Sequence, residues 1–189
     1  MVNDRKQEIL RTAIEIIADE GYGSLSMRGL ARASNMKLGA LQYHFRTWEA
    51  LLRALVDYIA DEIRQAFQSR RLESGPLSIR EIAAFMLDDP ADDSVLSDKL
   101  WPQLWAMQQV EPLVSDLLED VYAEYLKSLE TLIEAKGSQS PRAEALCLIS
   151  MLEGESLFTG SGRRWDGERG AVRDTIFDFI GERYGEQDA

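Results

Sequence analysis

The chain has 189 residues, enough for one ordinary domain or for a small domain followed by a larger one. Hydrophobic residues make up 45% and charged residues 29%, a globular balance that excludes collagenous and disordered chains. No run approaches the roughly 18 apolar residues of a membrane span, and the charged amino terminus lacks the apolar core of a signal peptide. A single cysteine permits no internal disulfide. We therefore expect a cytoplasmic protein that does not enter a membrane.

The net charge of −12 is unevenly distributed along the chain. Residues 1–50 contain seven Lys or Arg and six Asp or Glu, whereas residues 51–189 contain fourteen and 27. A slightly basic N-terminal segment therefore precedes a strongly acidic one. Because non-specific binding to nucleic acid is mostly phosphate electrostatics, the acidic segment opposes it. Any DNA contact must then come from the N-terminal segment, with two copies acting together.

Apolar periodicity predicts a first helix over residues 4–20, which Gly21 ends. Two shorter helices are predicted at residues 27–34 and 38–44. Ser26 is placed to cap the first of these two by accepting a backbone N–H bond. The spacing therefore predicts three helices within the first 46 residues.

The link between the two short helices is a tight corner. Asn35 is one of the few non-glycine residues that tolerate the left-handed conformation such a corner needs. On the second helix Leu41 and Phe45, four residues apart, point inward, while a polar face remains outside. Two short helices, a three-residue turn and a polar outer face are typical of a helix–turn–helix.

This stretch resembles the DNA-binding segment of the TetR family of bacterial transcriptional regulators. The family pattern has a Thr or Ser cap, an Ile-Ala or Leu-Ala pair, a turn, a Gly-x-Leu-Tyr-x-His-Phe run and a Lys-Glu pair that opens the next helix. The positions that match it are Ser26, Leu30, Ala31, Gly39, Leu41, His44, Phe45, Glu49 and Leu51.

The chain departs from the family pattern at four positions. Asn35 stands where glycine is common, and Lys37 stands where serine is common. Gln42 replaces a phosphate-binding tyrosine, and Trp48 replaces a lysine that often meets the DNA backbone. The resemblance implies a double-stranded DNA operator as a partner, with these DNA-binding residues: Ser26, Arg28, Lys37, Leu38, Gly39, Ala40, Gln42, Tyr43, His44 and Trp48.

The rest of the chain is predicted to be helical. Helices are expected at about residues 47–72, 78–87, 111–135, 141–158 and 171–184, and a further aromatic helix near residues 97–110 either kinks at Pro102 or starts just before it. The acidic turn at residues 88–93 is interpreted as a solvated loop. The fold class is thus all-α with about nine helices, divided into a DNA-binding head at residues 1–46 and a ligand-binding and dimerisation body at residues 47–189.

The last two long helices carry the predicted dimer interface. In the TetR family these helices pair with their copies in a second subunit to form a four-helix bundle. Small and bulky residues at helical spacing fit this role: Ala143, Leu146, Ile149, Ser150, Gly154, Ile176, Phe177 and Ile180. The alternative is that these faces complete the core of a single chain.

A ligand cavity is expected in the body. Its candidate lining residues are Met86, Trp101, Trp105, Tyr122, Tyr125, Met151, Glu155 and Phe158. Aromatic faces next to the carboxylates of Glu153 and Glu155 suit a cationic or flat aromatic ligand. For any single one of these residues, core packing is the alternative.

Catalytic chemistry is poorly supported. The only histidine, His44, lies in the helix–turn–helix, whereas a hydrolase triad or a zinc site requires histidine elsewhere. Cys147 lies between Leu146 and Leu148 and is expected to be a buried apolar residue. No phosphate-binding glycine motif is present, so no cofactor, no metal and no enzyme activity are predicted.

Three functional hypotheses follow. The first is a ligand-responsive TetR-like repressor, a homodimer that binds a palindromic operator and is released by a small-molecule effector. The second is a helical small-molecule-binding protein whose head no longer binds DNA, because of Gln42, Trp48 and the acidic body. The third, a small helical enzyme, lacks the catalytic residue types.

Overall fold

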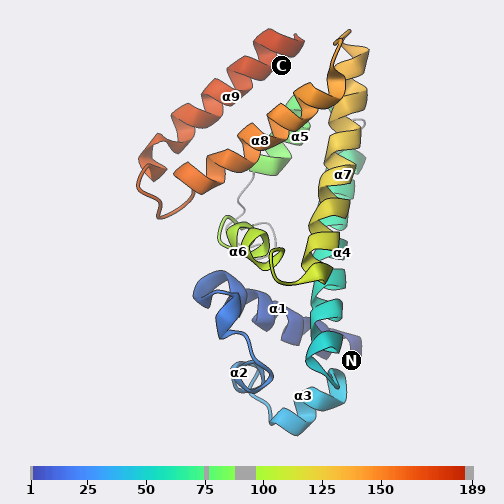
Figure 1. Ribbon diagram of the computed structural model, residues 1–189, viewed down its shortest axis with the longest axis vertical. Coiled ribbons are helices and arrows are strands. Elements are labelled where there is room, and N and C mark those ends of the chain that lie inside the picture. The colour runs from blue at the N-terminus through green and yellow to red at the C-terminus, as the bar shows by residue number, and fades with distance from the viewer. Residues whose placement is uncertain (1, 75–76, 88–96, 186–189) are drawn as a thin grey trace. The chain divides into compact units, whose positions relative to one another are not determined.

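The computed structural model describes residues 2–74, 77–87 and 97–185, and these residues are helical with no strand (Figure 1). The N-terminal elements are α1 (Val2–Glu20), the 3-10 turn η1 (Tyr22–Ser24), α2 (Met27–Ala33), α3 (Leu38–His44) and α4 (Trp48–Ser74). They are followed by α5 (Ile79–Leu87), α6 (Leu100–Met107), α7 (Pro112–Ala135), α8 (Pro141–Thr159), η2 (Asp166–Glu168) and α9 (Arg169–Tyr184). The predicted all-α fold is confirmed, while the acidic segment at residues 88–93 lies outside the described residues. No helix in the described part of the chain is long and apolar enough to cross a membrane.

Several helix boundaries follow from local hydrogen bonds that the sequence predicts. The Thr47 hydroxyl accepts from the backbone N–H of Ala50 at 3.1 Å and caps α4. Ser78 and Glu81 form a capping box, in which the hydroxyl accepts from Glu81 N at 3.1 Å and the carboxylate accepts from Ser78 N at 2.7 Å. These bonds lower the pKa of Glu81. Pro102 lies in the first turn of α6, so this helix starts just before the proline and does not kink there.

The described residues fall into two compact units. The first lies within Met1–Gln65 and Asp89–Glu119, and the second within Ala66–Asp88 and Asp120–Ala189. Helices α4 and α7 each contain residues of both units. The predicted domain boundary at residue 46 was inferred from the family resemblance and stays a prediction.

The first unit is built around α1. Ile9, Ile14 and Ile17 of this helix are fully buried, as are Leu30 of α2 and Leu41 of α3. Polar contacts supplement this packing: the guanidinium of Arg11 donates to the Tyr58 hydroxyl at 2.9 Å, and that of Arg5 donates to the Ser34 carbonyl at 2.8 Å. The second of these contacts places a cation at the C-terminal end of α2, where helix carbonyls lack partners.

The second unit packs α5, α8 and α9 against one another (Figure 1). Arg80 of α5 joins it to α9, because its guanidinium lies 4.4 Å from the Phe177 ring centre and donates to the Phe177 carbonyl at 3.3 Å. The buried stripe of α8 comprises Ala145, Leu148, Ile149 and Leu152. Cys147 falls off this stripe and is exposed, so the expectation of a buried cysteine is wrong.

Candidate DNA-binding and ligand-binding sites

The corner between α2 and α3 is a Schellman motif built on Asn35. Asn35 has φ of 51°, the left-handed conformation that asparagine tolerates. The N–H of Met36 donates to the Ala31 carbonyl at 2.8 Å, and the N–H of Asn35 donates to the Arg32 carbonyl at 3.0 Å. At the other end of α2, the Ser26 hydroxyl accepts from Gly29 N at 3.1 Å. Both local signals found in the sequence therefore set the limits of α2.

Helix α3 separates a buried side from an exposed one. Leu41 is fully buried and Phe45, which follows the helix, is 3% exposed. On the opposite side the Tyr43 side chain is 81% exposed, and its ring meets that of His44 edge to face at 5.6 Å. Of the ten predicted DNA-binding residues, those that lie at the surface are Ser26, Arg28, Lys37, Gly39, Ala40, Gln42 and Tyr43.

The remaining three predicted DNA-binding residues, Leu38, His44 and Trp48, are half-buried. The Trp48 ring lies 6.2 Å from the Tyr22 ring, so it contributes to packing within the first unit. The Tyr22 hydroxyl donates to the Glu111 carboxylate, and burial together with this bond raises the pKa of Tyr22. Nδ1 of His44 is buried with no hydrogen-bond partner among the described residues.

The predicted ligand-binding residues do not form one group. Trp101 and Trp105 belong to the first unit, and both are half-buried on α6. Tyr122 and Tyr125 lie on α7 within the second unit, as does Met86 on α5. The three from α8 line a groove against α9: Met151, Glu155 and Phe158.

Tyr125 belongs to an aromatic cluster inside the second unit. Its ring lies 5.5 Å from that of Phe67 and 6.2 Å from that of Phe85, and these two phenylalanines are 5.4 Å apart. Tyr125 and Phe85 are buried, and burial raises the pKa of Tyr125, with the charges of Glu153 and Glu124 adding to the effect. The sequence identified Tyr125 but not the two phenylalanines, whose helical spacing is equally typical of ordinary core residues.

Glu153 lies beside this cluster on α8. It accepts a hydrogen bond from the Tyr122 hydroxyl, which favours the ionised form. Burial outweighs that bond and raises the pKa of Glu153 to about 7. No basic side chain among the described residues contributes to this shift. Glu153 is therefore a partly buried carboxyl without a counter-charge.

Glu155, two residues along α8, has the opposite environment. Its side chain is only 1% exposed, but it accepts from Nε of Arg169 at 3.0 Å and from Nε of Arg173 at 3.3 Å. The Thr159 hydroxyl donates to the same carboxylate at 2.7 Å. Because two cations already compensate it, Glu155 is occupied as a link between α8 and α9.

An apolar groove of about 590 Å³ runs between α8 and α9. It combines residues predicted for ligand binding with three predicted for dimerisation, Ser150, Gly154 and Ile176. A Cβ atom built on Gly154 would meet no atom of the chain within 4 Å, so there is room beside this helix. The Phe158 ring is 56% exposed next to this groove and lies 6.4 Å from the exposed Trp165 ring.

The other predicted dimerisation residues lie at several depths. Ala143 and Leu146 are exposed and Phe177 is half-buried. Ile149, Ile176 and Ile180 are buried within the second unit. The exposed large side chains of α8 and α9 are Leu146, Leu157, Phe158 and Phe179.

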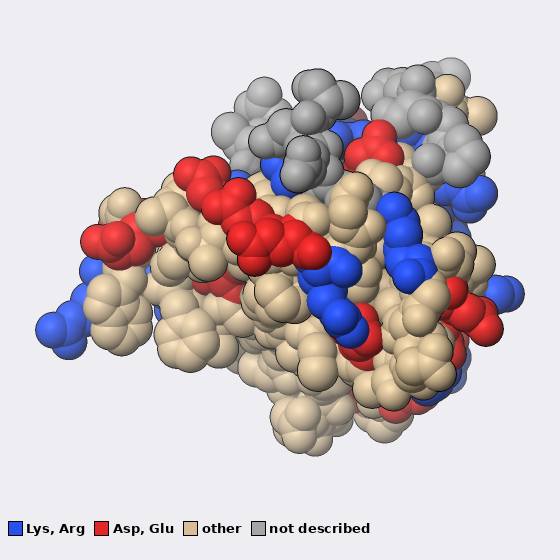
Figure 2. All heavy atoms as spheres, turned by 90° about the horizontal axis from the view of Figure 1, so that it is seen from above, with Lys and Arg blue, Asp and Glu red and all other residues tan. Residues whose placement is uncertain are grey.

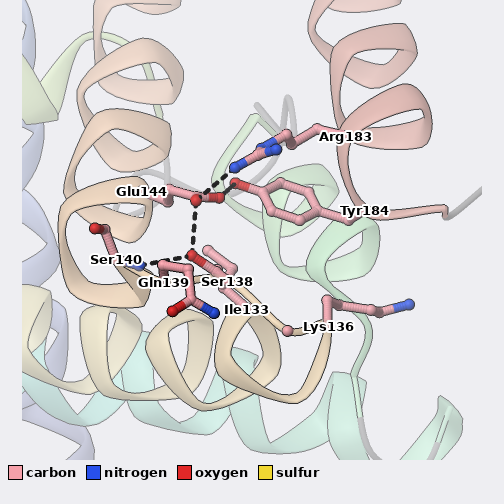
Figure 3. Close-up of a pocket in the computed structure, with 9 residues that line it drawn as sticks. Ile133, Lys136, Ser138, Gln139, Ser140, Glu144, Arg183 and Tyr184 are labelled. Atoms are coloured by element: carbon pink, nitrogen blue, oxygen red, sulfur yellow. Dashed lines mark hydrogen bonds and ion pairs between the residues drawn. The ribbon is translucent and has the colours of Figure 1, made fainter.

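A second cavity, of about 310 Å³, lies where the α7–α8 turn meets the end of α9 (Figure 3). Glu144 is its centre: the carboxylate accepts from the Ser138 hydroxyl at 2.7 Å, from Arg183 at 2.6 Å and from the Tyr184 hydroxyl at 3.2 Å. These bonds lower the pKa of Glu144. The network ties the first turn of α8 to the last turn of α9, and Glu144 has no free valence for a ligand.

These features define a helix–turn–helix protein with a second helical unit, and comparison with known proteins identifies its family. Residues 9–55 match the model described as bacterial regulatory proteins, tetR family. The chain is similar to the nicotine-responsive transcriptional repressor HdnoR of Paenarthrobacter nicotinovorans, at 26% identity over 82% of each chain. The protein is a TetR-family transcriptional regulator.

Solved structures agree with this assignment. A TetR-family regulator from Rhodococcus sp. has 25% identity and a TM-score of 0.68, covering 96% of this chain and 99% of its own. A regulator from Saccharomonospora viridis in complex with choline has a TM-score of 0.74 at 19% identity, covering 94% and 96%. The second likeness concerns the fold alone. The resemblance found in the sequence is thus confirmed, and these relatives are regulators and not enzymes.

Proposed function

We propose that this protein is a ligand-responsive repressor that binds a palindromic operator as a homodimer and leaves it when a small molecule binds. The observation that carries the DNA-binding role is the polarity of α3. Its inner residue Leu41 is fully buried, whereas Lys37, Gln42 and Tyr43 are exposed at its start and along its outer face. A short helix held from behind, with an accessible polar face, is what entry into the major groove requires.

The residues of this face divide into two kinds of contact. Lys37, Gly39, Ala40 and Tyr43 are assigned to base edges, with Leu38 beside them. Gln42, His44, Ser26, Arg28 and Trp48 are assigned to phosphates, which fix the position of the helix without reading sequence. Two copies would read half-sites separated by about one helical turn, roughly 34 Å, or more.

The acidic composition of the rest of the chain supports the need for two heads. The face in Figure 2 carries acidic and basic side chains next to one another with wide uncharged areas between them. The coloured part of this face thus lacks the continuous basic footprint of a DNA-binding surface. With one slightly basic segment per chain, a dimer supplies the phosphate contacts that one copy lacks.

We assign the dimer contact to the outer sides of α8 and α9. Leu146 is 49% exposed and Phe158 is 56% exposed, large apolar side chains that a second copy would cover. The groove beside Gly154 would admit a side chain of the partner. Ile149, Ile176 and Ile180 support this surface from inside, because they pack in the chain's own core.

A small-molecule effector is supported by the relatives. One is described as nicotine-responsive, and the Saccharomonospora viridis structure contains choline. An effector that binds better to a form whose heads are wrongly spaced shifts the population away from the DNA-bound form. DNA binding also implies that the protein acts in the cytoplasm.

The test is binding to promoter DNA that flanks the coding sequence, titrated with salt. We expect tight binding whose logarithm falls linearly with the logarithm of salt concentration, by about 0.9 per phosphate contacted. Tyr43→Ala should weaken binding about tenfold or more, since a specific base contact contributes about 1–3 kcal/mol. Val110→Ala, at an exposed site of the first unit away from the helix–turn–helix, is the control.

The alternative function is a small-molecule-binding protein whose head no longer binds DNA. Gln42, Trp48 and the acidic body favour it. Ligand binding without salt-dependent DNA affinity would support this alternative. Equal affinity of the wild type and the Tyr43→Ala variant for the promoter would instead reject the placement of α3.

A further inference from the structure

Glu153 is a partly buried acidic group of the second unit that the fold leaves without a counter-charge. Its only printed polar partner is the neutral Tyr122 hydroxyl, from α7. Glu155, one helix position away in the same α8 helix, shows how this fold treats a carboxylate that serves stability, because two arginines and a threonine surround it. A carboxylate removed from water costs free energy unless a cation or several donors compensate it. Glu153 has one donor.

The surroundings of Glu153 are aromatic. Tyr122 donates to it directly, and Tyr125 lies close enough for the Glu153 charge to act on its hydroxyl. Phe67 and Phe85 extend this group, with ring centres 5.5 Å and 6.2 Å from that of Tyr125. Tyr122 and Glu153 are half-buried, so the polar end of the group remains within reach of a ligand.

A carboxylate beside tyrosine rings recognises one chemical class well. Aromatic faces attract cations, and alkylated ammonium groups in particular, because the ring quadrupole is negative at the face. A carboxylate supplies the opposite charge, whereas an anionic ligand would meet repulsion there. A metal ion would need several more oxygen ligands, and the described residues contain no cluster of three or more His, Cys, Asp or Glu able to hold one.

We propose that the effector of this regulator is an organic cation of the alkylated ammonium class, whose charge pairs with Glu153 and whose substituents rest on the rings of Tyr122 and Tyr125. This inference rests on the proposed function, since it names the ligand class to which the regulator responds. It also assigns Glu155 a different role: Glu155 links α8 to α9 and takes no part in charge recognition.

The test uses two cations and one neutral analogue. Choline and 3,3-dimethylbutan-1-ol have nearly the same shape and differ by one positive charge, and phenyltrimethylammonium adds an aromatic substituent. Isothermal titration of the full-length protein should show binding of at least one of the two cations, and tenfold or more weaker binding of the neutral alcohol than of choline where choline binds. Glu153→Gln should weaken cation binding at least tenfold, while Glu134→Gln, at an exposed site of α7, should leave it unchanged.

A second variant keeps the carboxylate and removes a ring. Tyr122→Leu should weaken the cation that binds by fivefold or more, so the inference does not depend on one substitution. Failure of both cations to bind the wild-type protein overturns the inference, and so does equal affinity for wild type and Glu153→Gln.

The promoter-binding assay separates this inference from the proposed function. If the wild type binds promoter DNA and neither cation binds or releases it, the ligand class is wrong and the repressor remains. If a cation binds through Glu153 but the protein has no salt-dependent DNA affinity, the ligand site stands and the repressor is wrong.

Discussion

Replacing Glu153 by Gln should make the ligand-free protein more stable at alkaline pH and leave it almost unchanged in acid. The carboxyl has its pKa raised from 4.5 to about 7 in the folded protein, mainly by burial. The folded chain therefore holds a proton that the unfolded chain has lost between these two values. Stability contributed by this proton is complete below pH 4.5, declines as the pH rises, and is lost above pH 7.

The magnitude follows from the size of the shift. At about 1.4 kcal/mol per pKa unit, ionising Glu153 in the folded state costs about 3 kcal/mol once the pH is well above 7. Between pH 5 and pH 8 the free energy of unfolding of the wild type should fall by about 2.5 kcal/mol relative to Glu153→Gln. Glutamine keeps the shape and a hydrogen-bond acceptor for Tyr122, but it does not titrate.

Urea unfolding at both pH values, at one protein concentration, measures this difference. Because the protein is proposed to be a dimer, the concentration must be the same for every variant. Glu134→Gln, at an exposed site on α7, should follow the wild type at both pH values. A gap between wild type and Glu153→Gln that is equal at pH 5 and pH 8 would show that Glu153 is solvated or paired, and it would refute the reasoning.

Three further substitutions test the local structure. Ser26→Ala removes the cap of α2 and should lower the free energy of unfolding by about 1 kcal/mol, whereas Ser26→Thr should retain most of it. Asn35→Ala places a side chain that resists the left-handed conformation at the corner and should cost about 1 kcal/mol, measured by urea unfolding against Asn35→Gly, which should be neutral or stabilising. Glu155→Gln leaves two partly buried arginines without their anion and should cost about 2 kcal/mol or more in the same assay, with no effect on cation affinity.

The sequence predicted the fold well because local signals and apolar period agreed. Asn35 at the corner, Thr47 at the start of α4 and the Ser78–Glu81 box each specify a boundary through bonds within a few residues. The stripe predicted along α4, from Leu51 to Phe67, is buried throughout. A helix that follows its 3.6-residue period leaves little freedom over which side is covered.

The sites were predicted less completely because they depend on residues distant in the chain. The choice between Glu153 and Glu155 as a charged partner for a ligand is decided by Arg169 and Arg173, which lie 14 and 18 residues beyond Glu155. No local pattern states which of two neighbouring carboxylates these arginines will reach. Periodicity likewise cannot say that Trp101 and Trp105 belong to one compact unit and Tyr122 to another.

The two glutamates of α8 separate stability from recognition. Two residues along a helix turn the side chain by about 200°, so Glu153 and Glu155 face opposite sides. One side carries the arginines of α9 and closes the unit, and the other meets α7 and the tyrosines. A regulator needs this division, because a carboxylate satisfied by its own chain has no differential affinity to offer a ligand. The energy that an unpaired Glu153 costs the ligand-free protein is available to whichever cation supplies the missing charge.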